Sequence, residues 1–294
     1  MRKVSFKVLA LLAALTLVWG TNWPLFHIAL QELPVATFRT GVLSMALVVL
    51  GLVMRLRGES FTVPAGRWPP LILASLMNLI IWNIATSLAV LHIPSGHASV
   101  LAYTMPLWVA LLGFVVYRQP LNGRLLAAIA IGAVAVIALM IPNFRSYASA
   151  PQGLFWGLFA GFCWAIGTFV VKRTTWPGMG LSLTFWQVAI GWPPMALGMV
   201  VLDGWPQHMP STAALAATLY TGAVPMALGT ATWFALVKIL PTQVAALSSI
   251  AIPIVAVISG VLVLHEPLSA LQAVAIGSTV ISLWLALVPR RSVG

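Results

Sequence analysis

The sequence predicts an all-α integral membrane protein with ten transmembrane helices, arranged as two inverted five-helix repeats. Three observations lead to this fold class. The chain has 294 residues, of which 61% are hydrophobic and only 6% are charged, whereas soluble domains carry about 25% charged residues. The apolar residues form long runs separated by short polar stretches. The two halves of the chain also resemble each other when one is moved along the other by 147 residues.

The apolar runs are long enough to cross a bilayer as helices. A helix rises about 1.5 Å per residue, so about 20 residues span a hydrocarbon layer of about 30 Å. Backbone amides in lipid must be satisfied within their own segment, which favours helices, and the runs lack the alternating pattern of membrane barrels. The predicted segments are 8–30, 34–54, 69–91, 94–117, 122–141, 152–171, 180–202, 212–237, 241–264 and 268–288.

Lys and Arg residues are distributed unequally between the two sides of such a chain. All of them except Arg39 and Arg145 fall on the same side as both termini. Cytoplasmic loops of membrane proteins are enriched in Lys and Arg, so we expect both termini in the cytoplasm. Because the basic residues are scattered over several short loops, the net charge of +11 reflects topology and does not predict nucleic-acid binding.

Proline positions are the clearest sign of the internal repeat. At the shift of 147 residues, three prolines of the first half meet three of the second, namely Pro94, Pro106 and Pro120 with Pro241, Pro253 and Pro267. We therefore predict repeats at residues 1–147 and 148–294. Each repeat holds five helices, an odd number, so the second must cross the membrane in the opposite direction. Inverted repeats are typical of secondary transporters, which bind substrate near the midplane between the halves.

The whole chain resembles a known family. An arginine early in the second helix (TFRTG, around Arg39), proline-containing fourth and ninth helices, and the stretches QPL at 119–121 and HEPL at 265–268 are similar to the drug/metabolite transporter superfamily, EamA branch. Within that branch the chain most resembles the aromatic amino acid exporters of the YddG type. The resemblance implies export of amino acids, aromatic and other apolar or neutral ones. Gln119 departs from the glutamate that the family often has there, which leaves any role of that carboxylate to Glu266.

Polar and aromatic side chains at mid-membrane depth are the candidates for a substrate cavity. Many of them occur three or four residues apart on one predicted helix, which places them on the same helix face. An aromatic wall with a few amides suits an apolar body that bears a small polar head. Structural alternatives are amides that bridge helices, hydroxyls bonded to their own helix and tryptophans that only pack. The predicted substrate-binding residues are Trp19, Asn22, Asn78, Trp82, Asn83, Tyr103, Trp164, Thr168, Ser248 and Ser249.

Arg39 is the one charged residue in the interior of a predicted segment, since Arg124 stands at the start of the fifth. We predict a structural or gating role for it, in which the long side chain reaches toward the membrane surface, with substrate contact as the alternative. Pro106, Pro253 and Glu266 are the other predicted structural or gating residues. The four acidic residues all lie at predicted helix ends, so we expect no acidic proton relay at the midplane. A cavity without net charge is compatible with a zwitterion.

Other function classes fit the sequence less well. A membrane enzyme would need paired acids, a Ser and His dyad or a His and Glu pair on one helix, and none is evident, so we do not expect an enzyme. Cys163 is the single cysteine, and we expect neither a metal site nor a cofactor. An exporter of another small metabolite or drug stays open, as does a channel. The expected partners are a small-molecule substrate and lipid, without nucleic acid or an obligatory protein partner.

Overall fold

The computed structural model describes residues 6–116, 118, 123–140, 150–204, 209–240 and 249–264. All regular structure within these ranges is helical, as the sequence predicts. Seven of the described helices are long and apolar enough to cross a membrane, and their ends agree with the predicted segments within about three residues. These spans are Val8–Leu30, Val35–Arg57, Trp68–His92, Ser95–Val115, Pro151–Arg173, Ser182–Asp203 and Thr212–Ile239.

Two further helices lie where the fifth and ninth segments are predicted. α8 covers Gly123–Met140, and α15 covers Ile252–Leu264, the second part of the ninth segment. The predicted tenth segment, 268–288, lies outside the described residues. The count of ten helices therefore stays a prediction.

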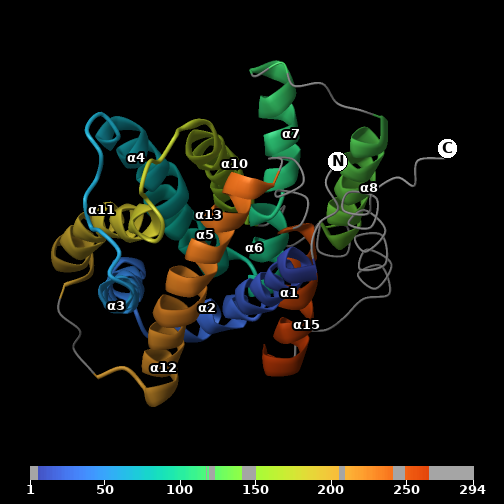
Figure 1. The fold of residues 1–294 in the computed structure, drawn as a ribbon. Helices are drawn as coiled ribbons and strands as arrows, with labels where there is room; N and C mark the ends of the chain where they lie inside the picture. Colours follow the sequence, from blue (N-terminus) through green and yellow to red (C-terminus); the bar gives the residue numbers. More distant parts are fainter. Residues whose placement is uncertain are drawn as a thin grey trace.

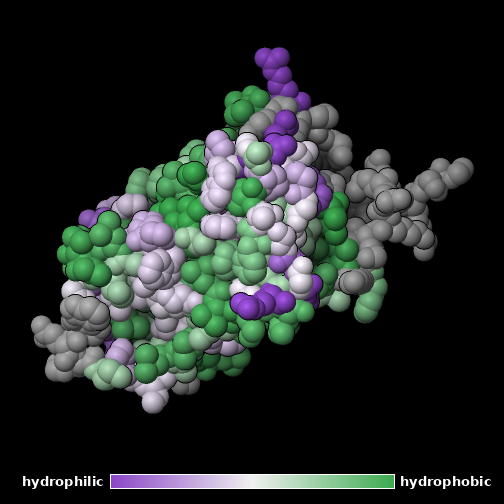
Figure 2. Space-filling model, turned by 60° about the vertical axis from the view of Figure 1, so that its left-hand side comes forward, coloured by the Kyte–Doolittle hydropathy of each residue, from purple (hydrophilic) through white to green (hydrophobic). Residues whose placement is uncertain are grey.

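Apolar side chains cover much of the outer surface (Figure 2). Leu56, Phe114, Leu197, Val201 and Leu202 are all largely exposed. A soluble protein seldom carries apolar surface of this extent, because it would associate through it in water. The surface therefore suits lipid, in agreement with the composition.

Several spans of the first half are interrupted near their middle. In the first span a turn at Thr21 separates two helices, and in the fourth a break at Tyr103 and Thr104 does the same. The third span contains one stretch of π-helix, η1. The elements are α1 (Phe6–Gly20), α2 (Asn22–Leu30), α3 (Val35–Arg57), α4 (Trp68–Ser75), η1 (Leu76–Ile81), α5 (Trp82–His92), α6 (Ser95–Ala102) and α7 (Met105–Val115).

The second half has interruptions of its own. A π-helix, η4, divides the eighth span, and a short 3-10 turn, η5, precedes α15. Among the described spans of the second half, only the one formed by α10 is regular α-helix from end to end. The elements are α10 (Pro151–Arg173), α11 (Ser182–Gly198), η3 (Met199–Asp203), α12 (Thr212–Thr221), η4 (Gly222–Gly229), α13 (Thr230–Ile239), η5 (Ser249–Ala251) and α15 (Ile252–Leu264).

Two of the interruptions fall at matching positions in the two halves, whereas the turn at Thr21 has no counterpart in α10. At the shift of 147 residues, η1 falls within η4, and the first residue of α7 falls on the first residue of α15. Pro106 and Pro253 are the second residues of those two helices. Proline is tolerated in the first turn of a helix but interrupts the helix when it lies in the interior. The two prolines thus explain why each of these helices restarts at the same place.

α3 and α11 lie side by side and run antiparallel (Figure 1). Asp203, the last residue of η3, accepts hydrogen bonds from the backbone N–H and the hydroxyl of Thr37 in the first turn of α3, at 2.6 and 2.8 Å. Glu59, just after α3, accepts one from the backbone N–H of Leu181 before α11, at 3.0 Å. The first N–H groups of a helix lack partners within it. Each helix of this pair therefore has its start capped from the end of the other.

Glu32 makes a similar contact with the eighth span. Its carboxylate accepts hydrogen bonds from the hydroxyl and the backbone N–H of Ser211, which precedes α12, both at 2.6 Å. Both bonds lower the pKa of the Glu32 carboxyl from its ordinary value, and the bond from the hydroxyl has the larger effect. Glu32, Glu59 and Asp203 are the acidic residues that the structure describes, and each caps a helix at an end of the bundle. None of these three carboxylates lies in the middle of a described span.

Basic residues that the sequence places on one side meet at one end of the bundle. The ammonium group of Lys172 donates to the carbonyls of Lys238 and Leu240 at 3.0 and 2.8 Å. The ammonium group of Lys238 donates to the carbonyl of Met179 at 2.8 Å. Cations near the last carbonyls of a helix are favourable because those groups carry partial negative charge. Lys172 therefore caps the end of α13, and Lys238 bonds the loop between α10 and α11. The assignment of both lysines to the cytoplasmic side stays a prediction.

Small residues allow α10 to approach α6 closely. Gly153, Gly157 and Gly161 recur every four residues along α10. A Cβ on Gly161 would lie 2.6 Å from the carbonyl oxygen of Ala102, and one on Gly157 would lie 2.6 Å from the Cβ of Leu101. Glycines at this spacing let membrane helices pack backbone to backbone. The two halves of the chain are therefore in close contact at the break between α6 and α7.

Candidate functional site

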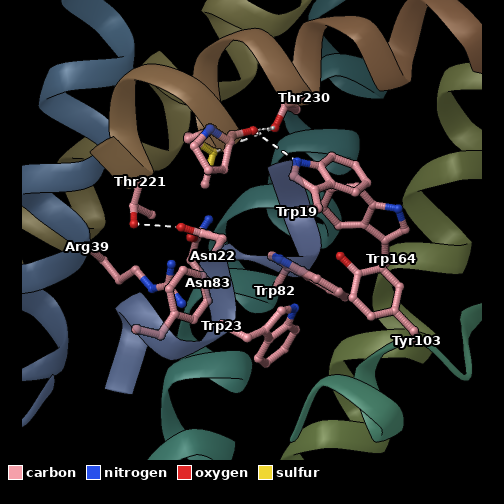
Figure 3. Close-up of a pocket in the computed structure, with 13 residues that line it drawn as sticks. Trp19, Asn22, Trp23, Arg39, Trp82, Asn83, Tyr103, Trp164, Thr221 and Thr230 are labelled. Carbon is pink, nitrogen blue, oxygen red and sulfur yellow. Dashed lines mark hydrogen bonds between the residues drawn. The ribbon is translucent and has the colours of Figure 1, made fainter. Parts of the chain in front are cut away.

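A cavity lies inside the bundle where the interrupted spans converge on α10 (Figure 3). Its volume is about 40 Å³, enough for a group no larger than a few water molecules. Six of the ten predicted substrate-binding residues line it: Trp19, Asn22, Trp82, Asn83, Tyr103 and Trp164. Phe26, Arg39, Trp23, Thr221, Pro225, Met226 and Thr230 complete the lining.

The helix interruptions bring the lining residues to the cavity. Asn22 is the first residue of α2, Trp82 is the first of α5, and Tyr103 lies in the break between α6 and α7. Pro225 lies within η4, and its carbonyl accepts a hydrogen bond from the indole N–H of Trp19 at 3.0 Å. π-helical turns inside α-helices occur frequently at functional sites. The cavity is therefore placed where the backbone departs from regular helix.

Aromatic rings form one end of the cavity. The ring of Trp164 lies 4.6 Å from that of Trp82 and 5.8 Å from that of Trp19, measured between centroids. Tyr103 lies 6.0 Å from Trp82. Trp233 is not part of the lining but packs against these rings, with its centroid 5.7 Å from that of Trp19. Such separations and the tilted or edge-on orientations are those that aromatic pairs favour.

Polar groups form the other end (Figure 3). The amide oxygen of Asn22 accepts a hydrogen bond from the hydroxyl of Thr221 at 2.8 Å. The amide nitrogen of Asn83 donates to the carbonyl of Leu79 at 2.6 Å, while its amide oxygen has no partner in the described part of the chain. Arg39 completes this end. The cavity is thus polar at one end and aromatic at the other.

Arg39 does not reach toward the membrane surface, so that part of the sequence-based expectation is wrong. Its side chain is fully buried. Nε donates to the hydroxyl of Ser87 at 2.7 Å, and Nη2 donates to that of Thr86 at 3.0 Å. The guanidinium also lies over the ring of Phe26, 4.1 Å from its centroid. These acceptors and this ring hold the cation inside the bundle, where it lines the cavity.

The remaining predicted residues lie elsewhere. The hydroxyl of Thr168 donates to the carbonyl of Trp164 at 2.9 Å, the ordinary contact of a helical threonine with its own backbone. Ser249 is buried in η5 and is not part of the lining. Pro106 and Pro253 begin helices outside the cavity. Ser248 and Glu266 lie outside the described residues, so their predicted roles stay predictions.

Asn78 is also outside the cavity. It lies in η1, and its amide packs so closely on α10 that a Cβ on Gly167 would overlap it. Both amide atoms are buried without a hydrogen-bond partner among the described residues. Asn78 therefore packs between η1 and α10 and is not part of the lining.

Replacing Asn78 by leucine, which has the same number of side-chain heavy atoms and the same branching, should raise the thermal stability of the purified protein. The substitution removes two unsatisfied polar atoms, and leaving such a group buried costs about 1–3 kcal/mol. Thermal unfolding in detergent, followed by tryptophan fluorescence, measures the effect. Asn83→Leu is the matched control and should lower stability, because it removes the bond to Leu79. A destabilised Asn78→Leu variant would mean that the amide is satisfied after all.

Several lining residues escaped the sequence analysis. Trp23 and Phe26 share the helical face of Trp19 and Asn22, so their spacing was a usable signal. Thr221 and Thr230 flank η4, and the wider π-helical turn between them changes which residues face the same way. Spacing rules for a regular helix could not have selected that pair.

Comparison with known proteins agrees with this architecture. Residues 6–141 and 151–288 each match the model of the EamA-like transporter family, so the same model fits both halves. The chain is 24% identical over 268 residues to "Uncharacterized transporter YvbV" of Bacillus subtilis, covering 88% of this chain and 84% of the relative. It is 26% identical over 290 residues to a "Probable amino-acid metabolite efflux pump" of Salmonella typhimurium, covering 92% and 90%.

A solved structure has the same fold. It superposes with a TM-score of 0.73 at 17% sequence identity, over 95% of this chain and 96% of the other. At that identity the likeness concerns the fold alone. The two family matches span nearly the whole sequence, and the apolar surface and buried cavity suit a transport protein. The chain therefore belongs to the EamA-like transporter family.

Proposed function

We propose that this protein is a secondary transporter that exports amino acids, aromatic and other apolar or neutral ones, across the bacterial inner membrane by alternating access. The cavity carries the proposal. Its aromatic end suits an apolar side chain, and its amides and guanidinium suit a small charged head. The relative named as a probable amino-acid metabolite efflux pump is in line with this substrate class.

Two halves of similar structure and opposite orientation are a common basis of alternating access. The double family match and the matching positions of η1 and η4 support a repeat at residues 1–147 and 148–294. α3 and α11 begin at equivalent positions of the two halves and run antiparallel, which supports inversion. On this proposal ten helices form two inverted five-helix repeats, with both termini in the cytoplasm.

The size of the cavity defines the state of the transporter. A volume of about 40 Å³ cannot hold an amino acid, so the proposal requires the cavity to widen. The cavity is surrounded by the turn at Thr21, the break at Tyr103 and the π-helices η1 and η4. These are the points at which the backbone has the fewest regular helical bonds to lose. We take the structure as a state in which the cavity is too narrow for the substrate.

Transport into proteoliposomes tests the proposal. Labelled phenylalanine, labelled threonine and a panel of drugs are offered to purified protein, and the same phenylalanine assay in everted membrane vesicles gives the direction. We expect saturable phenylalanine uptake that speeds up when the vesicles contain unlabelled phenylalanine. Flux of a drug without amino acid flux would replace the substrate class. Flux that neither saturates nor exchanges would indicate a channel.

A further inference from the structure

We propose that Arg39 and Asn83 form the head-group site of this cavity. The guanidinium of Arg39 binds the carboxylate of the substrate, and the amide oxygen of Asn83 accepts a hydrogen bond from its ammonium group. The inference rests on the proposed function, because it assigns the orientation of an amino acid in the same cavity.

The buried cation lacks a counter-charge within the described part of the chain. Both hydrogen-bond partners of Arg39 are neutral hydroxyls, those of Ser87 and Thr86. The third nitrogen, Nη1, has no partner there. The carboxylates of Glu32, Glu59 and Asp203 are engaged at helix starts. Burying a charge without an opposite charge is costly, the more so in a membrane. A substrate carboxylate would supply the missing charge.

The geometry leaves one nitrogen of the buried guanidinium without a hydrogen-bond partner. The rings of Phe26 and Phe38 lie 4.1 and 4.8 Å from its central carbon. Ser87 and Thr86 occupy Nε and Nη2. Nη1 is the remaining donor of a residue that lines the cavity. A carboxylate accepts strongly from guanidinium N–H groups, so it is the anion that this donor fits.

Asn83 supplies the complementary acceptor. Its amide nitrogen is bonded to the carbonyl of Leu79, which fixes the orientation of the amide and leaves the oxygen unpaired. Asn83 lies at the same end of the cavity as Arg39, away from Trp164 and Tyr103 (Figure 3). An α-amino acid carries a cation and an anion on one carbon. A free acceptor beside a free cationic donor matches that pair.

This orientation predicts which compounds are recognised. The head group binds at Arg39, and the side chain points toward the aromatic wall formed by Trp19, Trp82 and Trp164. Phenylalanine should bind well, whereas phenylalaninamide and phenethylamine lack the carboxylate and should bind poorly. The single buried cation of the described lining also disfavours solutes with several negative charges.

Binding of these three compounds to the purified protein tests the inference. We expect wild-type protein to bind phenylalanine at least about tenfold more tightly than phenylalaninamide, a difference of about 1.4 kcal/mol. Arg39→Gln should remove this preference, with a loss for phenylalanine and little change for the amide. Arg39→Lys keeps the charge and should retain part of it. Arg55→Gln removes an exposed charge from the same helix and should behave like wild type.

A second variant decides the matter if Arg39→Gln does not fold. Asn83→Asp keeps the shape of the side chain and places a carboxylate beside Arg39. It should weaken phenylalanine binding and strengthen phenethylamine binding, which reverses their order. An unchanged order in a folded Asn83→Asp protein would overturn the inference, as would wild-type protein that does not distinguish phenylalanine from its amide.

The proposed function and this inference fail in different ways. If wild-type protein moves no amino acid into proteoliposomes, the proposed function falls. If amino acid flux and affinity are present and remain unchanged in folded Arg39→Gln, only the head-group assignment falls.

Discussion

Replacing Trp164 by alanine is expected to lower phenylalanine transport at least about tenfold. Trp164 stands at the centre of the aromatic wall, with ring contacts to Trp19, Trp82 and Phe234. Each favourable aromatic pair contributes about 0.5–1.5 kcal/mol beyond buried area, and a tenfold change in affinity corresponds to about 1.4 kcal/mol. The concentration dependence of uptake into proteoliposomes measures the effect.

Two control variants separate this loss from a loss of folding. Trp156→Ala removes a tryptophan from the same helix, where the ring contacts Phe155 and Phe159 and is not part of the lining. It should transport nearly as well as wild type. Trp164→Phe keeps an aromatic ring and should fall between the two. Equal transport by Trp164→Ala and Trp156→Ala, in proteins of similar thermal stability, would remove Trp164 from the site.

Replacing Gly161 by alanine should cause a large loss of stability. The added Cβ would lie 2.6 Å from the carbonyl oxygen of Ala102 and 3.1 Å from the hydroxyl oxygen of Thr104. Neither the backbone oxygen nor the neighbouring break can move far, so α10 and α6 must separate. Overpacking of this kind costs about 1–3 kcal/mol. Thermal unfolding in detergent should shift downward by roughly 3–10 °C.

Gly51→Ala is the matched control for this substitution. It lies in the interior of α3, where a Cβ would be 3.6 Å from the nearest atom, in the ring of Phe185. That is an ordinary contact, and alanine favours helix over glycine by about 1 kcal/mol. The control should be as stable as wild type or more stable. A Gly161→Ala protein with the same unfolding temperature as Gly51→Ala would contradict the close contact described between α10 and α6.

The ends of the spans were predictable from the sequence because hydropathy is a local property. Seven spans agree with the predicted segments within about three residues. The interruptions inside them were less accessible. Pro106 and Pro253 mark two of these interruptions in the sequence, but η1 contains no proline. A π-helical turn depends on packing between helices, which the local sequence does not record.

The same π-helix explains the mistaken placement of Asn78. In a regular helix, residues four apart lie on one face, which grouped Asn78 with Trp82. η1 covers Leu76–Ile81, and its i to i+5 bonding rotates the residues that follow. Trp82 therefore lines the cavity while Asn78 packs on Gly167. Spacing was not a complete guide even in regular helix, because Thr168 lies four residues after Trp164 in α10 and is not part of the lining.

Arg39 shows a different limit of the sequence. Its depth near the start of the second span was read correctly, but the direction of a long side chain depends on which acceptors are near. Thr86 and Ser87 lie 47 and 48 residues away in the chain. Two adjacent hydroxyls in a neighbouring span are too common a pattern to be assigned to one arginine in advance.

The reciprocal caps between α3 and α11 restrict how this bundle can deform. Sliding one helix along the other by a single turn, about 5.4 Å, would pull Asp203 from Thr37 and Glu59 from Leu181 together. Both carboxylates and both helix starts would lose their partners in one step. α3 and α11 should therefore move together as one rigid body. Rearrangement during a transport cycle should take place where this pair contacts the interrupted spans.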